Sequence, residues 1–158
     1  MAIGTDANID FFGTADQLDD TTTSAITDGS FSVAADISAW TNDDDAKLAL
    51  FKIKWQYASG TIDTGARIHL YARRMNIDST EDENTPSATY RHAHVCSFIV
   101  DTALGTSTDQ EILAVGSLEH LNAETSQQYE FYLENATGVT IAANWDLRIY
   151  PKASGPHA

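Results

Sequence analysis

The sequence predicts an all-β protein, an antiparallel β-sandwich whose strand number favours an eight-stranded jelly roll, with an extended N-terminal arm. Three observations lead to this prediction. Apolar and polar residues alternate with a period of two in several stretches after residue 47, as they do in half-buried strands. Turn-forming residues separate these stretches, and almost none of them has helical periodicity. About eight short strands in a chain of 158 residues fit a sandwich or jelly roll.

The clearest strand covers residues 47–57, where apolar residues alternate with Lys52, Lys54 and Gln56. Its apolar face carries Phe51, Ile53, Trp55 and Tyr57. Two further stretches alternate in the same way. Residues 66–75 place Ile68, Leu70 and Ala72 on one face, and residues 128–134 do the same with Tyr129, Phe131 and Leu133. The remaining strands are expected at 90–101, 111–115 and 140–150, and a short helical turn only within 109–124.

The chain is expected to form a single domain with three parts: an acidic N-terminal part (1–46), a sandwich body (47–150) and an extended tail (151–158). Residues 1–46 contain ten Asp and no Lys or Arg, with isolated apolar residues between them. This pattern indicates an arm with short strands, which gains more from lying along another surface than from packing on itself. We expect the arm to contact a neighbouring subunit through Ile3, Ile9, Phe11 and Phe12.

Composition excludes several classes of partner. The formal net charge is −14, and phosphate backbones are bound by Lys and Arg, so nucleic acid is not expected. No apolar run approaches the roughly 20 residues that cross a bilayer, so no membrane partner is expected. Met1–Phe12 also lacks the pattern of a signal peptide. Without one, the Asn135-Ala136-Thr137 glycosylation sequon is interpreted as coincidence.

No catalytic, cofactor or metal site is expected. His92 and His94 share a strand face and His69 lies on another strand, but their spacing does not define a zinc site. The acidic runs at 42–45 and 78–83 lack the alternation of a calcium loop and are interpreted as solvated. Cys96 lies in an apolar strand pattern typical of a buried thiol. Since no carboxylate pair, nucleophile elbow or phosphate loop stands out, the chain is expected not to be an enzyme.

Exposed aromatic rings raise a second possibility, because β-sandwiches can bind sugars by stacking. Trp55 and Trp145 fall on apolar strand faces and are expected in the core. Tyr71, Tyr132 and Tyr150 fall on polar faces, so a glycan platform would be built from these three tyrosines.

Several short motifs resemble the pattern of small virion proteins of tailed bacteriophages. They occur in order along residues 47–152: Leu70-Tyr71-Ala72-Arg73, Tyr90-Arg91-His92, Ser97–Asp101, Gln128–Asn135, Thr137-Gly138, Trp145-Asp146-Leu147 and Pro151-Lys152. The resemblance implies a non-enzymatic structural protein with a jelly-roll body. Such proteins decorate or cement the outside of the phage head, often at local three-fold positions, and others belong to tails.

The sequence therefore leads to two hypotheses. The first is a decoration or cement protein on the outer capsid surface, made in the host cytoplasm, that binds the major capsid protein and copies of itself, with a trimer favoured. The charge of −14 fits the outside, because packaged DNA repels it across a Debye length of about 8 Å. The second is a carbohydrate-binding module or a tail-associated adsorption protein.

Overall fold

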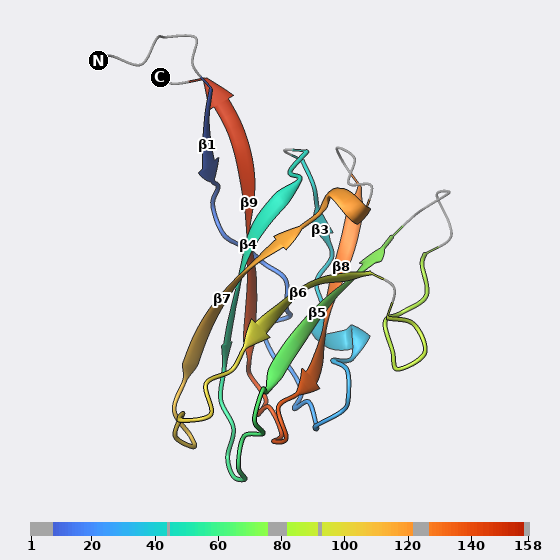
Figure 1. The fold of residues 1–158 in the computed structure, drawn as a ribbon. Coiled ribbons are helices and arrows are strands. Elements are labelled where there is room, and N and C mark those ends of the chain that lie inside the picture. The colour runs from blue at the N-terminus through green and yellow to red at the C-terminus, as the bar shows by residue number, and fades with distance from the viewer. Residues whose placement is uncertain (1–7, 44, 76–81, 92, 122–126, 157–158) are drawn as a thin grey trace, which may run out of the picture.

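Two antiparallel β-sheets face each other and enclose the core (Figure 1). The computed structural model describes residues 8–43, 45–75, 82–91, 93–121 and 127–156, with the backbone alone at 8–11 and 153–156. The predicted all-β sandwich is confirmed. Within the described residues, the strands are β1 (Asn8–Phe12), β2 (Asp16–Gln17), β3 (Trp40–Thr41), β4 (Leu48–Trp55), β5 (Arg67–Arg74), β6 (His94–Ile99), β7 (Gln110–Ser117), β8 (Gln128–Ala136) and β9 (Asp146–Pro156).

The strand pairing is that of a jelly roll. One sheet has the order β1-β9-β4-β7, with β2 also paired to β9, and the other has the order β3-β8-β5-β6. The pairs are nested: β5 with β6, β4 with β7, β3 with β8 and β2 with β9. The chain therefore folds as one long antiparallel ladder wrapped around a core. Strands β1 and β2 pair with successive parts of the same edge of β9, so together they take the place of one strand in the sheet. Counted in this way, the sandwich has the eight strands predicted from the sequence.

The core between the sheets follows the alternation in the sequence. Strand β4 buries every second residue, and Phe51, Ile53 and Trp55 are at most 1% exposed. Aromatic rings from both sheets meet in the centre, with the Phe51 and Phe131 centroids 5.4 Å apart. Trp145 is 2% exposed and Cys96 is 6% exposed, so both lie in the core as predicted.

Gly116 allows the two edge strands β6 and β7 to close one side of the sandwich. A Cβ at this position would lie 2.6 Å from Cγ1 of Val95 and 2.9 Å from Cε2 of Phe51. Such distances are well inside van der Waals contact, so any side chain at 116 would push the sheets apart.

Two predicted strands begin several residues later in the structure. Strand β6 starts at His94 rather than at residue 90, because Ser87 and Tyr90 form a turn closed by reciprocal backbone hydrogen bonds of 3.1 and 3.0 Å. Strand β9 starts at Asp146 rather than at residue 140, since the chain turns at Asn144, whose φ is +66°. Before that turn, Ile141 makes an isolated bridge to Ile26.

Helical structure in the described residues consists of two 3-10 turns, η1 (Ala34–Asp36) and η2 (Glu119–Leu121). The second lies within the stretch where a short helical turn was predicted. No helix among these residues has the length and hydropathy needed to span a membrane.

Candidate functional site

The two ends of the chain pair with each other to form a ribbon that extends beyond the sandwich (Figure 1). Residues 8–12 of β1 pair with residues 152–156 of β9, and Gly13 N donates to Pro151 O at 2.8 Å where the ribbon joins the body. The predicted tail is therefore largely strand. We call residues 8–12 and 152–156 the terminal ribbon.

The predicted contact residues of the arm lie on or before this ribbon. Phe12 is on β1 and is 44% exposed. Ile9 and Phe11 are on the same strand, but their side chains lie outside the described residues, as does Ile3 entirely. The ribbon thus carries an exposed aromatic ring away from the core of its own chain.

The rest of the acidic N-terminal part packs on its own sandwich rather than extending from it. Leu18 and Ile26 are at most 2% exposed. Asp19 accepts a hydrogen bond from Leu147 N at 2.7 Å, and burial raises the pKa of this carboxyl above its usual value. Asp16 accepts from Trp40 Nε1 at 3.0 Å. The acidic residues therefore fix this segment to the body as well as supplying charge.

Asn135 also fixes the N-terminal segment to the body, through Ile26. It is fully buried, and its Nδ2 donates to Ile26 O at 2.8 Å and to Val139 O at 2.7 Å. Its Oδ1 accepts from the backbone and the hydroxyl of Thr137. Both ends of the amide are therefore engaged within the folded chain.

The three candidate tyrosines do not form the exposed platform considered from the sequence. Tyr71 is 6% exposed and Tyr132 is fully buried, both on the outward side of the four-stranded sheet. Tyr150 lies on β9, in the other sheet. The alternation placed Tyr71 and Tyr132 on the correct side of the strands, but further chain covers that side.

The cover over Tyr71 comes from Phe31 and Arg91. The Phe31 and Tyr71 ring centroids are 5.6 Å apart, and the Arg91 guanidinium carbon lies 5.9 Å from the Phe31 centroid. Tyr71 OH donates to Glu134 Oε2 at 2.9 Å, and Arg91 pairs with the other oxygen of Glu134. Burial, with the hydrogen bond to Glu134, raises the pKa of Tyr71 to about 12.

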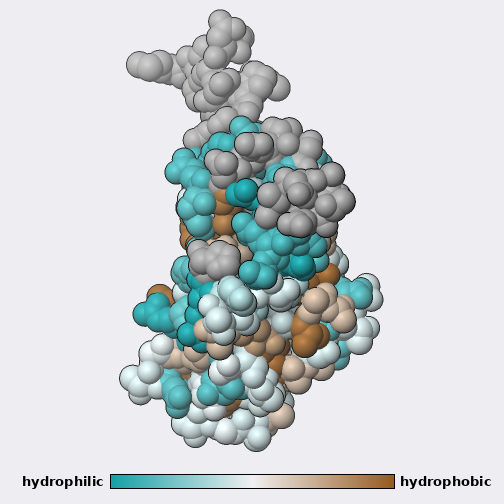
Figure 2. All heavy atoms as spheres, turned by 90° about the vertical axis from the view of Figure 1, so that its right-hand side faces the viewer, coloured by the Kyte–Doolittle hydropathy of each residue, from teal (hydrophilic) through white to brown (hydrophobic). Residues whose placement is uncertain are grey.

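A second polar cluster covers Tyr132. Its hydroxyl donates to Glu130 Oε2 at 2.6 Å, and Arg73 Nη1 donates to the same oxygen at 3.0 Å. Arg73 also reaches the 82–91 loop through Asp82 and the carbonyl of Glu83. Burial, followed by the bond to Glu130, raises the pKa of Tyr132 to about 12. Figure 2 shows this side of the molecule, where hydrophilic residues gather and hydrophobic residues form only small patches.

The histidines of this face converge on one serine. His69 Nδ1 and His94 Nε2 lie 2.7 and 2.9 Å from Ser97 Oγ, and burial lowers the pKa of both imidazoles. His92 lies outside the described residues. No group of three or more possible metal ligands occurs in the described part of the chain. A small hollow of about 100 Å³ lies nearby, lined by Arg74, Glu83, Ala93, His120, Leu121 and Tyr129.

The outward side of the five-stranded sheet is open and carries apolar residues that alternation did not reveal. Leu113 and Val115 on β7 are 58% and 57% exposed. The stretch 112–115 is apolar throughout, so its period does not tell which residues point outward. The pairing with β4 decides the direction: Leu113 lies opposite Lys52, and residues that lie opposite each other in a sheet point to the same side.

No family model matches the sequence, and no curated protein matches it. Solved structures that resemble the fold weakly include the following two. One contains the CBM22-1–GH10 modules of Clostridium thermocellum endo-1,4-β-D-xylanase 10B complexed with xylohexaose, with a TM-score of 0.45 and 10% identity over 95% of this chain and 30% of that chain. The other is infectious bursal disease virus, Gx strain, with a TM-score of 0.43 and 11% identity over 98% of this chain and 33% of that chain. The protein thus spans about a third of each, and similarity at this level does not assign a function.

Proposed function

We propose that the protein is a non-enzymatic structural subunit of a tailed-phage particle that decorates or cements the outer capsid surface. The observation that carries this proposal is the terminal ribbon, which both chain ends form outside the core and which exposes Phe12. A ribbon of this kind can lie over the capsid protein or a neighbouring copy and bury apolar area, worth about 25 cal/mol per Å². Many weak contacts of this kind on one particle add through multivalency.

Charge and sequence support the same proposal. The net charge of −14 suits an outer surface rather than contact with packaged DNA. The resemblance to phage virion proteins spans roughly residues 47–152, which include most of the two sheets. The jelly roll itself serves as a rigid body that holds the ribbon in place. On the particle, the protein is proposed to form a trimer at local three-fold positions.

The experiment that tests the location is immunogold electron microscopy on intact particles from the source of the protein. Gold over heads supports the proposal. Gold on tails moves the function to adsorption, and a glycan array then tests sugar binding. Particles without gold remove the virion hypothesis.

A second experiment tests the ribbon. Phe12→Ala is expected to weaken attachment of the purified protein to particles that lack it, measured by co-sedimentation. The matched control is Tyr90→Ala, because Tyr90 is equally exposed at 44% but lies outside the ribbon. Deletion of residues 1–12 is expected to abolish attachment while the thermal unfolding transition is retained. Full attachment of the deletion variant would contradict the role of the ribbon.

A further inference from the structure

Strand β7 forms an edge of the five-stranded sheet that lacks the usual protection. It pairs with β4 over all eight residues without a register shift, and within the described residues no strand lies on its other side. Proteins commonly block such edges with charges, proline, bulges or very short strands. Glu111 is the one charged residue of β7. The edges of the other sheet differ: β3 has two residues, and β6 pairs through an irregular register.

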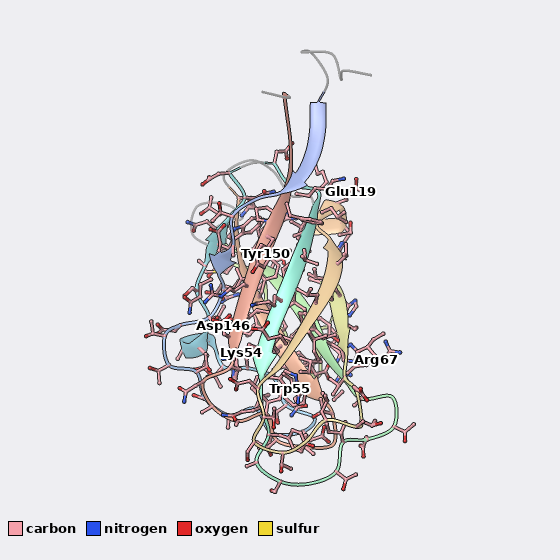
Figure 3. The ribbon with its side chains drawn as sticks, turned by 90° about the vertical axis from the view of Figure 1, so that its left-hand side faces the viewer. Lys54, Trp55, Arg67, Glu119, Asp146 and Tyr150 are labelled. Carbon is pink, nitrogen blue, oxygen red and sulfur yellow. The ribbon has the colours of Figure 1, made fainter. Side chains whose placement is uncertain are left out.

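The side chains next to this edge form an apolar row across the sheet. Val115 lies opposite Leu50, which lies opposite Tyr150 on β9. Figure 3 shows this face, with Tyr150 on β9, β4 next to β9, and β7 on the far side of β4. Leu113 extends the exposed apolar surface along β7. The free edge and the apolar row thus lie together at β7.

Charge indicates what can approach this face. Four of the nine basic residues of the chain lie on its outward side: Lys52, Lys54, Arg148 and Lys152. Three of them pair with acids at 2.8 to 3.2 Å: Lys52 with Glu111, Lys54 with Asp109, and Arg148 with Asp146. The face is therefore close to neutral in a chain of net charge −14. The net charge of the whole chain therefore does not oppose contact between two copies through this face.

We propose that β7 pairs antiparallel with β7 of a second copy, joining two five-stranded sheets across a two-fold axis. This contact rests on the proposed role in assembly and adds to it a surface distinct from the terminal ribbon. In this pairing, residues that point outward must lie opposite residues that point outward. The two-fold axis must therefore pass through one residue of β7 and not between two residues. Centring on Ala114 places Leu113 opposite the second copy's Val115 and Glu111 opposite its Ser117. Centring on Leu113 would place Glu111 opposite Val115, which leaves a carboxylate against an apolar side chain.

Cross-linking tests this register. Leu113→Cys and Val115→Cys proteins are purified separately, mixed in equal amounts and oxidised. The mixture is expected to form several times more disulfide dimer than either protein alone, because the two positions face each other only between different variants. Cys96 does not interfere, since it is buried. Val33→Cys, 50% exposed on the N-terminal segment, is the background control. A dimer yield in the mixture no higher than that control overturns the proposal.

Sedimentation equilibrium of the full chain tests the association itself. The wild type is expected to dimerise, and Leu113→Lys to raise the dissociation constant at least about tenfold. Val33→Lys adds the same charge elsewhere and is expected to leave the constant unchanged. A wild type that stays monomeric at about 100 µM overturns the proposal. If the protein is monomeric and immunogold still labels phage heads, the β7 contact is wrong and the proposed function stands. If the protein dimerises and immunogold labels no particles, the proposed function is wrong and the β7 contact stands.

Discussion

The outward sides of the two sheets differ in whether other segments of the chain pack on them. On the four-stranded sheet, Phe31, Arg91 and the 82–91 loop cover Tyr71 and Tyr132. On the five-stranded sheet, Leu113 and Val115 remain more than half exposed. A polar residue type on an outward face is therefore no guide to exposure when another segment packs on it. The covered face stabilises the fold, and the open face is available for contacts.

The largest expected effect comes from removing the side chain that holds the N-terminal segment in place. Asn135→Ala removes the amide that donates to the carbonyls of Ile26 and Val139 and leaves the buried Thr137 N without its acceptor, so it is expected to lower the free energy of unfolding by about 3 kcal/mol. Urea denaturation followed by tryptophan fluorescence measures this. Asn84→Ala, at an exposed position, is the control and should change stability by less than about 0.5 kcal/mol. Equal effects would show that the segment is not held through Asn135.

A matched pair of acidic residues compares the two faces directly. Glu134→Ala leaves the Tyr71 hydroxyl buried without its acceptor, so we expect a loss of about 2 kcal/mol. Asp109→Ala removes an ion pair with Lys54 in which the Asp109 and Lys54 side chains are 55% and 44% exposed, so its effect on stability should be much smaller. Similar losses in urea denaturation would mean that the cover over Glu134 does not exclude water.

The dependence of stability on alkaline pH tests whether Tyr71 and Tyr132 are shielded from water. The pKa of Tyr71 and of Tyr132 is raised to about 12, above the ordinary value of 10. Both phenols are neutral in the folded and unfolded states below pH 10, and between pH 10 and 12 the unfolded state loses the protons first. Stability is therefore expected to fall as pH rises through this window. In Tyr71→Phe the fall should be smaller, as measured by chemical denaturation at each pH. An unchanged slope would place Tyr71 in contact with solvent.

The smallest expected effect concerns the histidines at the edge of the covered face. Burial lowers the pKa of His69 and His94 below 6.5. Their stabilising contribution is present above pH 6.5 and is lost as pH falls, because the unfolded state takes up protons first. NMR titration of the imidazole Cε1 protons should give pKa values below 6.5 for both. Values at or above 6.5 would contradict the desolvation of these two imidazoles.

Several features of the protein follow from the sequence alone. The period of two identifies Phe51, Ile53 and Trp55 as core residues, because side chains of a strand alternate between its faces. The same rule places Tyr71 and Tyr132 on the outward side, and the apolar pattern around Cys96 predicts its burial. These properties are local and need only the geometry of a strand.

Other features were decided by the tertiary structure. The pairing of residues 8–12 with residues 152–156 joins the two ends of the chain, and no local pattern specifies such a partner. The burial of Tyr71 depends on Phe31, forty positions earlier, and the exposure of Leu113 depends on the outward side of β7 having no segment packed on it among the described residues. A strand pattern tells which side chains share a face. Which face is covered depends on contacts between segments that are distant in the sequence.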